Sequence, residues 1–541
     1  MRIFKTLLLA ACFASVLAGC GSGSSSSGAS VNTSTARGTL IENPPLRIAS
    51  LNAADLTAQL NASPSGQQLL QIASSGTMSL PCGVDFHYIQ YATVGGAGET
   101  TTASGALMVP TGTGAQCTGA RPIVLYAHGT STVRSYNIAA ISDATNAANG
   151  ESALIAAMFA AQGYIVVAPN YAGYDSSPLP YHPYLDADQQ SKDMIDALTA
   201  ARSALGQIFA PDSDNGRLFI TGYSQGGHVA MATARAMQAA SLPYTAVAPM
   251  SGPYALAAFG DAVFFGNVDL GATVFTPMLT TSYQKAYGNI YAATTDVFSS
   301  TYATGIDTLL PSAMSLDALF QQNKLPQTAL FDNAPPTTGG AVPALDALFP
   351  TITPPTTPAA QAPLFALGFA ASNYLITNNY RLAYVADALQ NPDGAVPAVT
   401  TGMPAAAPAN TMRQAFKLND LRSFVPTSPM LLCAGGEDPT VFYSIDTGLM
   451  AKLLTPEVNA GLVTVVDVDP ATSATPAGAL QTAFGSAETA VSTAAYNAAI
   501  TAGASTAAAT AAAQGAVVQA YHGTLVPPFC ATAARSFFSN F

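Results

Sequence analysis

Residues 218–228 read Leu-Phe-Ile-Thr-Gly-Tyr-Ser-Gln-Gly-Gly-His and combine an apolar strand, a tight turn and the start of a helix. The string Gly-x-Ser-x-Gly around Ser224 is weak evidence by itself, because the chain contains 44 glycines. Its setting is more informative, since the strand 218–221 precedes it directly and a helical pattern begins at Gly227. Glycine on both sides lets the backbone turn without Cβ clashes, which leaves the serine hydroxyl exposed at the strand end. We therefore predict a nucleophilic Ser224; the alternative is a glycine-rich turn without chemistry.

Further apolar runs flank this stretch along the chain. They occupy residues 123–127, 164–168, 246–248, 430–434 and 463–466. Helix-length patterns lie between the earlier runs, at 152–162, 187–205 and 227–239. Short apolar strands that alternate with helices are typical of a mostly parallel sheet covered by helices on both faces. The predicted fold class is α/β.

The strand pattern is interrupted between about residues 253 and 425. This stretch is rich in Phe and Tyr and contains a Pro/Thr-rich run at 335–357. We predict that 253–425 is a cap, or lid, inserted between two parts of the core, 46–252 and 426–541. An Ala-rich stretch at 486–520 reads as a helical or partly loose insertion into the second part.

The N-terminus resembles a bacterial export signal. Two basic residues precede an apolar run that is too short to span a bilayer, and small residues lead into Cys20. This arrangement resembles the lipobox of bacterial lipoproteins, in which the cysteine is lipidated. We predict a signal peptide at 1–19, a lipidated Cys20 and a flexible Gly/Ser/Thr-rich tether at 20–45. The expected location is the cell envelope, at the outer membrane, or outside the cell; an ordinary secretory signal is the alternative.

The amino-acid composition limits which kinds of partner the protein is expected to bind. Of 541 residues, 49% are hydrophobic and only 9% are charged, and the formal net charge is −12. High apolar content excludes a disordered polar chain, and the lack of a Lys/Arg cluster argues against nucleic acid. Contact with a membrane is expected only through the N-terminal lipid anchor, and the oligomeric state is left open.

A serine hydroxyl needs a neighbouring base before it can attack, and the chain has five histidines. Behind a serine elbow of this kind, the acid and then the histidine follow along the chain. Only His228 and His522 follow Ser224. His228 lies on the helix that starts at the elbow, so its ring cannot easily swing over the hydroxyl. We therefore predict that His522 is the base, ahead of a terminal helix at 530–538.

The base needs a carboxylate that fixes its tautomer. Asp438 follows the apolar run 430–434 after two glycines, and Pro439 prevents immediate entry into a helix. A sharp turn followed by proline holds the carboxylate on a rigid loop. We predict that Asp438 is the acid, with Glu437 and Asp446 as the nearest rivals.

Two backbone N–H groups are needed to bind the oxyanion of an acyl-transfer intermediate. The amide of Gln225, directly after the nucleophile, is one candidate. The other should lie on the loop after the early strand 123–127, where His128-Gly129-Thr130 resembles an oxyanion motif of esterases. The amide of Thr130 is therefore the second candidate. A simple packing role for His128 is compatible with this, because the donor is backbone.

Four cysteines remain after the signal peptide and Cys20 are set aside. They are Cys82, Cys117, Cys433 and Cys530. An even number in an oxidising compartment predicts disulfides, and four cysteines allow three pairings. Cys82 and Cys117 bracket a predicted hairpin at 85–110, so we favour that pair. If the acid and base loops meet, Cys433 and Cys530 become neighbours and form the second. Free thiols are the alternative, and the absence of Cys-x-x-Cys argues against a zinc site.

These motifs resemble the α/β-hydrolase superfamily, and most closely its secretory lipase family, which includes the yeast A-type lipase and bacterial relatives. The resemblance rests on residues 127–130, 170–174, 222–228 and 436–441 and extends from about residue 85 to the C-terminus. It implies ester hydrolysis on acyl chains beneath a helical lid. The family usually carries Asp where Asn170 stands, and the gap between acid and base is long here.

The sequence therefore predicts a serine carboxylic-ester hydrolase, a lipase or esterase that cleaves apolar acyl or aryl esters through an acyl-enzyme. Lipids and polyester oligomers fit an aromatic cap better than sugars do. No cofactor and no metal are expected. A serine peptidase or amidase is the first alternative, since a nucleophile does not reveal the leaving group. A non-catalytic, surface-binding lipoprotein on the same scaffold is the second.

Overall fold

A nine-stranded sheet forms the centre of the computed structural model, which describes residues 35–72, 79–208, 213–473 and 478–541. The strand order is β1-β2-β3-β5-β4-β6-β7-β10-β11. The strands are β1 (Leu46–Leu51), β2 (Gly83–Val94), β3 (Thr100–Thr111), β4 (Arg121–Ala127), β5 (Ile165–Pro169), β6 (Asp214–Tyr223), β7 (Ala246–Met250), β10 (Met430–Ala434) and β11 (Val463–Asp467). The signal peptide, Cys20 and the first part of the predicted tether lie outside the described residues.

The sheet is antiparallel at one edge and parallel in the rest. β1, β2, β3 and β5 pair antiparallel in turn, and the strands from β5 to β11 are parallel. All five residues of β5, β7 and β10 are buried, which explains why these strands are continuously apolar in the sequence. The predicted α/β class with a mostly parallel sheet is confirmed.

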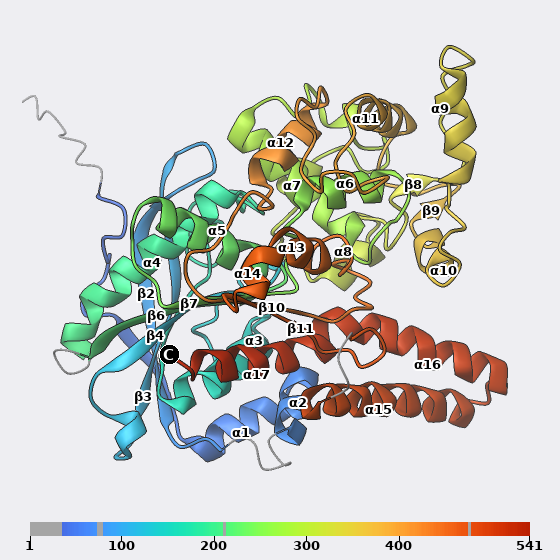
Figure 1. Ribbon diagram of the computed structural model, residues 1–541. Helices are drawn as coiled ribbons and strands as arrows, with labels where there is room; N and C mark the ends of the chain where they lie inside the picture. The colour runs from blue at the N-terminus through green and yellow to red at the C-terminus, as the bar shows by residue number, and fades with distance from the viewer. Residues whose placement is uncertain (1–34, 73–78, 209–212, 474–477) are drawn as a thin grey trace, which may run out of the picture. The chain divides into compact units, whose positions relative to one another are not determined.

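Helices cover both faces of the sheet (Figure 1). α4 (Ala187–Ile208) and α5 (Gln225–Ala239) pack together on one face. α3 (Asn149–Met158) and α17 (Val526–Phe538) pack on the other, beside α1 (Ala53–Asn61) and α2 (Pro64–Ile72). α17 begins at Val526 and therefore starts earlier than the helix expected from residue 530.

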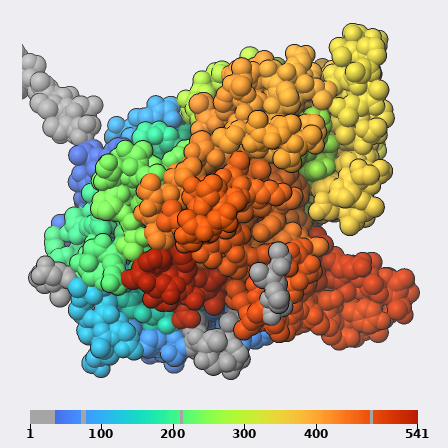
Figure 2. All heavy atoms as spheres, viewed as in Figure 1, coloured from blue at the N-terminus to red at the C-terminus, as the bar shows by residue number. Residues whose placement is uncertain are grey.

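The stretch between β7 and β10 contains α-helices of 5 to 16 residues and one small two-stranded sheet. These elements are α6 (Leu256–Phe264), α7 (Ala272–Tyr287), α8 (Leu316–Gln321), β8 (Phe331–Asp332), α9 (Pro343–Leu348), α10 (Ala362–Ala366), β9 (Phe369–Ala370), α11 (Asn378–Gln390) and α12 (Thr411–Asn419). Their buried side chains form a hydrophobic cluster separate from that of the large sheet. In Figure 2, α9 and α10 (yellow) lie at the surface of the molecule. The role of this stretch as a cap stays a prediction.

The Ala-rich stretch forms two long helices, α15 (Ala479–Thr501) and α16 (Thr506–Ala520), that pack against each other (Figure 1). α16 continues through a π-helical turn, Tyr521–Leu525, into α17. Two smaller helices, α13 (Thr447–Leu453) and α14 (Thr455–Asn459), lie between β10 and β11. Among the described helices, none is both long and apolar enough to cross a bilayer.

Both disulfides favoured by the sequence analysis are present. Cys82 is bonded to Cys117, at the outer end of the β2–β3 hairpin, with a Cα–Cα distance of 5.6 Å. Cys433 on β10 is bonded to Cys530 on α17, also with a Cα–Cα distance of 5.6 Å. The second bond ties β10, the strand next to the edge strand β11, to the C-terminal helix.

Candidate active site

Ser224 occupies the sharp turn between β6 and α5. Its backbone angles are φ 59° and ψ −121°, a conformation that ordinary residues rarely adopt and that costs about 1–3 kcal/mol. A Cβ on Gly222 or Gly226 would overlap the backbone carbonyl of Ala127, so glycine is required at both positions. The turn is held from below by the hydrogen bond from Ser224 N to Met250 O, 3.0 Å long. This geometry presents the Ser224 hydroxyl above the parallel strands.

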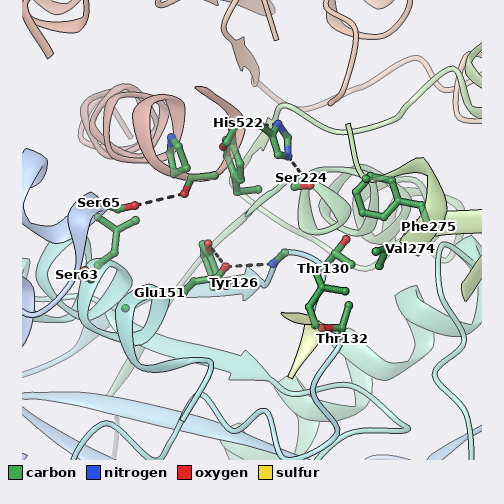
Figure 3. Close-up of a pocket in the computed structure, with 18 residues that line it drawn as sticks. Ser63, Ser65, Tyr126, Thr130, Thr132, Glu151, Ser224, Val274, Phe275 and His522 are labelled. Atoms are coloured by element: carbon green, nitrogen blue, oxygen red, sulfur yellow. Dashed lines mark hydrogen bonds between the residues drawn. The ribbon is translucent and has the colours of Figure 1, made fainter. Parts of the chain in front are cut away.

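The three predicted catalytic side chains lie together in one hydrogen-bonded chain. His522 Nε2 is 2.8 Å from Ser224 Oγ, and His522 Nδ1 is 2.6 Å from Asp438 Oδ2 (Figure 3 shows the first contact). Asp438 Oδ1 accepts hydrogen bonds from the amides of Thr440 and Val441, at 2.9 and 3.0 Å. The Asp438 side chain is fully buried, whereas the His522 side chain is 13% exposed.

Tyrosines on both sides fix His522, and the sequence analysis did not identify them. Tyr223 donates a hydrogen bond of 2.6 Å to His522 O, and its ring lies against the imidazole. Tyr521 accepts a hydrogen bond from the amide of Glu437 and donates one to Asp469, so it joins the acid loop to the base segment. The Cys433–Cys530 bond ties the same two segments together.

The residues that the sequence offered as alternatives to His522 and Asp438 do not belong to this hydrogen-bonded chain. His228 is buried in α5 and donates from Nε2 to Asn419 O at 2.9 Å, and burial lowers its pKa to about 4. Asp446 is fully buried and accepts from the amide of Ala255; burial raises its pKa well above the usual value. The side chain of Glu437 is exposed.

The amides of Thr130 and Gln225 lie on the two loops that flank Ser224. Neither N–H donates a hydrogen bond to any residue in the described part of the chain, so both are free for a ligand. The loop after β4 is held on its other side, where Gly129 N donates to Glu151 Oε1 at 3.1 Å. The ring of His128 is stacked between Tyr136 and Tyr171.

A cavity of about 450 Å³ opens beside Ser224 and His522. One part of its wall is polar, with Ser63, Ser65 and Glu151. The other part is apolar and is formed by residues from the stretch between β7 and β10, Val274, Phe275 and Leu316. Figure 3 shows Ser63, Ser65 and Glu151 on one side of the cavity and Val274 and Phe275 on the other. Among the described residues, no cluster of His, Cys, Asp and Glu could hold a metal ion.

Asn170, where the family usually carries Asp, has a structural role. Its Oδ1 accepts from the amide of Ile138 at 2.8 Å, and its Nδ2 donates to Ser104 Oγ at 2.9 Å. The amide thus uses a donor that a carboxylate would lack, which explains how the loop after β5 accommodates the exchange.

Comparisons with known proteins bear on the fold and on the broad class of the chain. Residues 151–262 match the model of the prolyl oligopeptidase family. No curated protein matches the sequence. The rice cell wall degrading esterase LipA from Xanthomonas oryzae is similar in structure, with 25% identity over 90% of this chain and 98% of that chain and a TM-score of 0.59. A mutant form of the same esterase gives 24% identity over 94% and 99%, with a TM-score of 0.62.

A protein from Legionella pneumophila shares the fold, with 19% identity, coverage of 79% of this chain and 91% of that chain, and a TM-score of 0.56. The family match begins in α3, includes the Ser224 turn and ends in α6. These findings confirm the predicted α/β-hydrolase fold. The strand order, the serine turn and the similarities together show that the chain is a serine hydrolase of the α/β-hydrolase fold.

Proposed function

We propose that the protein hydrolyses carboxylic esters, with Ser224 as nucleophile, His522 as general base and Asp438 as its orienting acid. The observation that carries this proposal is the hydrogen-bonded chain Ser224–His522–Asp438 at the wall of an open cavity. His522 takes the proton of the Ser224 hydroxyl as the oxygen attacks the ester carbonyl, and then gives it to the leaving alcohol. Water, activated by the same imidazole, releases the acid from the acyl-enzyme.

The oxyanion that forms during attack is bound by the amides of Thr130 and Gln225. Both N–H groups lie beside Ser224 and lack a protein acceptor among the described residues. Two preset donors stabilise the intermediate strongly, and the loss of one costs about 10²–10³ in kcat.

The acyl or aryl group is expected at the apolar end of the cavity, against Val274, Phe275 and Leu316. Burial of apolar substrate surface there contributes about 25 cal/mol per Å². The name of the Xanthomonas oryzae neighbour, an esterase, supports ester cleavage, although its rice cell wall substrate belongs to that protein.

Hydrolysis of p-nitrophenyl esters by the wild type and by Ser224→Ala tests the proposal. We expect the variant to lose activity by at least about 10⁴-fold, because the nucleophile is gone. A fluorophosphonate probe should label the wild type and leave Ser224→Ala unlabelled. His228→Gln serves as the matched control, since His228 is buried on the same helix but makes its contact with Asn419. Turnover by Ser224→Ala at the wild-type rate would refute the assignment.

The match to the prolyl oligopeptidase family favours a second candidate, peptide or amide hydrolysis by the same residues. Paired substrates with one acyl group, a p-nitrophenyl ester and a p-nitroanilide, separate the two. The proposed esterase cleaves only the ester efficiently, whereas a peptidase cleaves a peptidyl anilide as well. A surface-binding protein without catalysis would cleave neither and would not react with the probe.

Phe275 offers a test of the acyl position. It lines both the catalytic cavity and a neighbouring apolar cavity of about 50 Å³ between α6 and α7. Phe275→Ala should join the two spaces and shift the preferred p-nitrophenyl ester toward longer acyl chains. Phe320→Ala is the control, because Phe320 lines a different cavity and not the one beside Ser224. An unchanged chain-length profile in Phe275→Ala would place the acyl group elsewhere.

We also propose export and lipid anchoring through Cys20. The two disulfides support an oxidising compartment. The wild type should partition into the detergent phase of a Triton X-114 extract, and Cys20→Ala should not. Equal partition of both proteins would contradict the anchor.

A further inference from the structure

The side chain of Gln225 is buried behind the catalytic serine and contacts a histidine that the reaction does not use. Gln225 is 1% exposed and His182 is 3% exposed. Gln225 Nε2 lies 2.7 Å from His182 Nε2, within hydrogen-bond distance. The amide of the same residue, Gln225, is the proposed oxyanion donor, so whatever fixes its side chain also restrains that amide.

The direction of this hydrogen bond follows from the other ring nitrogen. His182 Nδ1 lies 2.9 Å from Ala172 O, and a carbonyl oxygen can only accept, so Nδ1 carries the proton. Burial lowers the pKa of His182 to about 3, and the ring is therefore neutral at ordinary pH. A neutral ring has one lone pair left, on Nε2, and it accepts the Gln225 amide. Gln190 Nε2 is more distant, at 3.5 Å.

His182 also belongs to a buried stack of rings that reaches the second oxyanion loop. Its ring stacks on Tyr171 at a centroid distance of 5.6 Å, and Tyr171 stacks on His128 at 4.1 Å. The hydroxyl of Tyr171 donates to His128 O at 3.1 Å. His128 precedes Gly129 and Thr130, the second proposed donor. The stack therefore connects the two segments that supply the N–H groups.

We propose that His182 is a positioning residue that holds the oxyanion donors in place, by accepting a hydrogen bond from Gln225 and by packing on Tyr171. This inference rests on the proposed function. The donors must point at a charge that exists only in the transition state, and a displacement of about 1 Å can cost up to 10² in rate. The serine turn has an unfavourable backbone conformation, so the peptide after it needs an anchor outside the turn.

Three variants test the contact between His182 and Gln225. His182→Leu removes the acceptor, Gln225→Met removes the donor while its backbone N–H remains, and His182→Gln restores an acceptor near the position of Nε2. We expect His182→Leu and Gln225→Met each to lower kcat by about 10–100-fold, with KM changed less than about twofold. The double variant should be no slower than either single one, because both remove one shared contact. His182→Gln should recover most of the lost kcat.

His228→Leu is the matched control, since it removes a buried histidine on α5 whose side chain, within the described part of the chain, hydrogen-bonds Asn419 O. It should lower Tm and leave kcat within about twofold. Wild-type kcat in folded His182→Leu and Gln225→Met, or additive losses in the double variant, would overturn the inference. If His182→Leu does not fold, Gln225→Met and His182→Gln still decide. Full activity in Ser224→Ala would instead refute the proposed function.

Discussion

The two oxygens of Asp438 have different partners, and this difference selects the tautomer of His522. Oδ1 is occupied by the amides of Thr440 and Val441, so only Oδ2 faces the imidazole. A carboxylate that accepts at Oδ2 keeps the proton on Nδ1 and leaves the Nε2 lone pair for Ser224. In the proposed mechanism, the acid loop thus controls the reactivity of Ser224 through His522.

Asp438→Asn should reverse that tautomer. The amide oxygen must take the place of Oδ1 to accept the two backbone N–H groups, which turns the NH₂ group toward His522. Nδ1 then has to accept, Nε2 carries the proton, and Ser224 has no base. We expect kcat for a p-nitrophenyl ester to fall by about 10⁴-fold with little change in Tm. A fall of less than tenfold would indicate that Asp438 does not orient the base.

Asp186 should make folding stability depend on pH. It caps α4 by accepting from the amide of Gln189 at 3.1 Å, and burial raises its pKa to about 6. Since the unfolded value is about 4, the folded protein keeps a proton that the unfolded chain loses between about pH 4 and pH 6. The free energy of unfolding therefore falls as pH rises through this window, by up to about 3 kcal/mol.

Asp186→Asn keeps the cap and abolishes the titration. In urea unfolding, the variant should match the wild type near pH 4 and exceed it at pH 7. Asp317→Asn is the control, because Asp317 is an exposed residue of α8. Parallel stability curves for wild type and Asp186→Asn across this range would contradict the assigned pKa.

At the scale of elements, the turn between β6 and α5 can form only because its backbone comes very close to the backbone of Ala127. A Cβ at Gly226 would collide with the carbonyl of Ala127, whereas Gly515 in α16 has no neighbouring atom within 4 Å of that position. Gly226→Ala should destabilise the protein by about 2 kcal/mol or more and abolish ester hydrolysis. Gly515→Ala should stabilise it by up to about 1 kcal/mol, because alanine favours the helix. Thermal unfolding compares the pair, and equal Tm values would show that the turn tolerates a side chain.

The strands that can be predicted from the sequence are those with buried side chains on both faces of the sheet. β4, β5, β7 and β10 are apolar because helices cover both faces of the sheet. β1 is harder to foresee, since it is an edge strand whose Leu46 is 63% exposed and which therefore lacks a clear alternating pattern. The helices α9 and α10 span only six and five residues, too short for a periodic signal.

Some residues of the candidate site could likewise be predicted from the sequence, and others could not. Ser224, Asp438 and His522 could be named from motif, chain order and elimination, and the structure brings them together, although their roles remain proposals. Tyr223, Tyr521 and His182 could not be named, because their partners are distant in the chain. Tyr223, for example, contacts a residue 299 positions away, and no local pattern records such a contact.

At the scale of the folded chain, charged residues are rare, and some of them form buried ion pairs. Arg413 bonds Asp261 and Asp387, each at 2.7 Å, and Arg422 bonds Asp393 at 2.6 Å. All of these residues lie between β7 and β10 in the chain. Each arginine has two buried carboxylate partners, since Arg422 also bonds Asp420 at 2.9 Å. Loss of either arginine would leave buried carboxylates without a cation, which costs about 3–5 kcal/mol.

The two disulfides should differ in their effect on activity. In the chain-entropy model, each contributes about 4–5 kcal/mol, given separations of 35 and 97 residues. Replacement of Cys433 and Cys530 by Ala should lower both Tm and kcat, because the bond ties β10, below the acid loop, to the helix after His522. Replacement of Cys82 and Cys117 should lower Tm and leave kcat of the folded protein unchanged. Equal losses of kcat in both double variants would contradict this distinction.

The four bonded sulfurs sit in side chains that are at most 1% exposed. Dithiothreitol or glutathione in a buffer therefore cannot reach the two disulfides while the protein is folded. Such agents can reduce the two bonds only while heat or urea opens the interior, and a chain that refolds afterwards lacks the stabilisation that these bonds contribute.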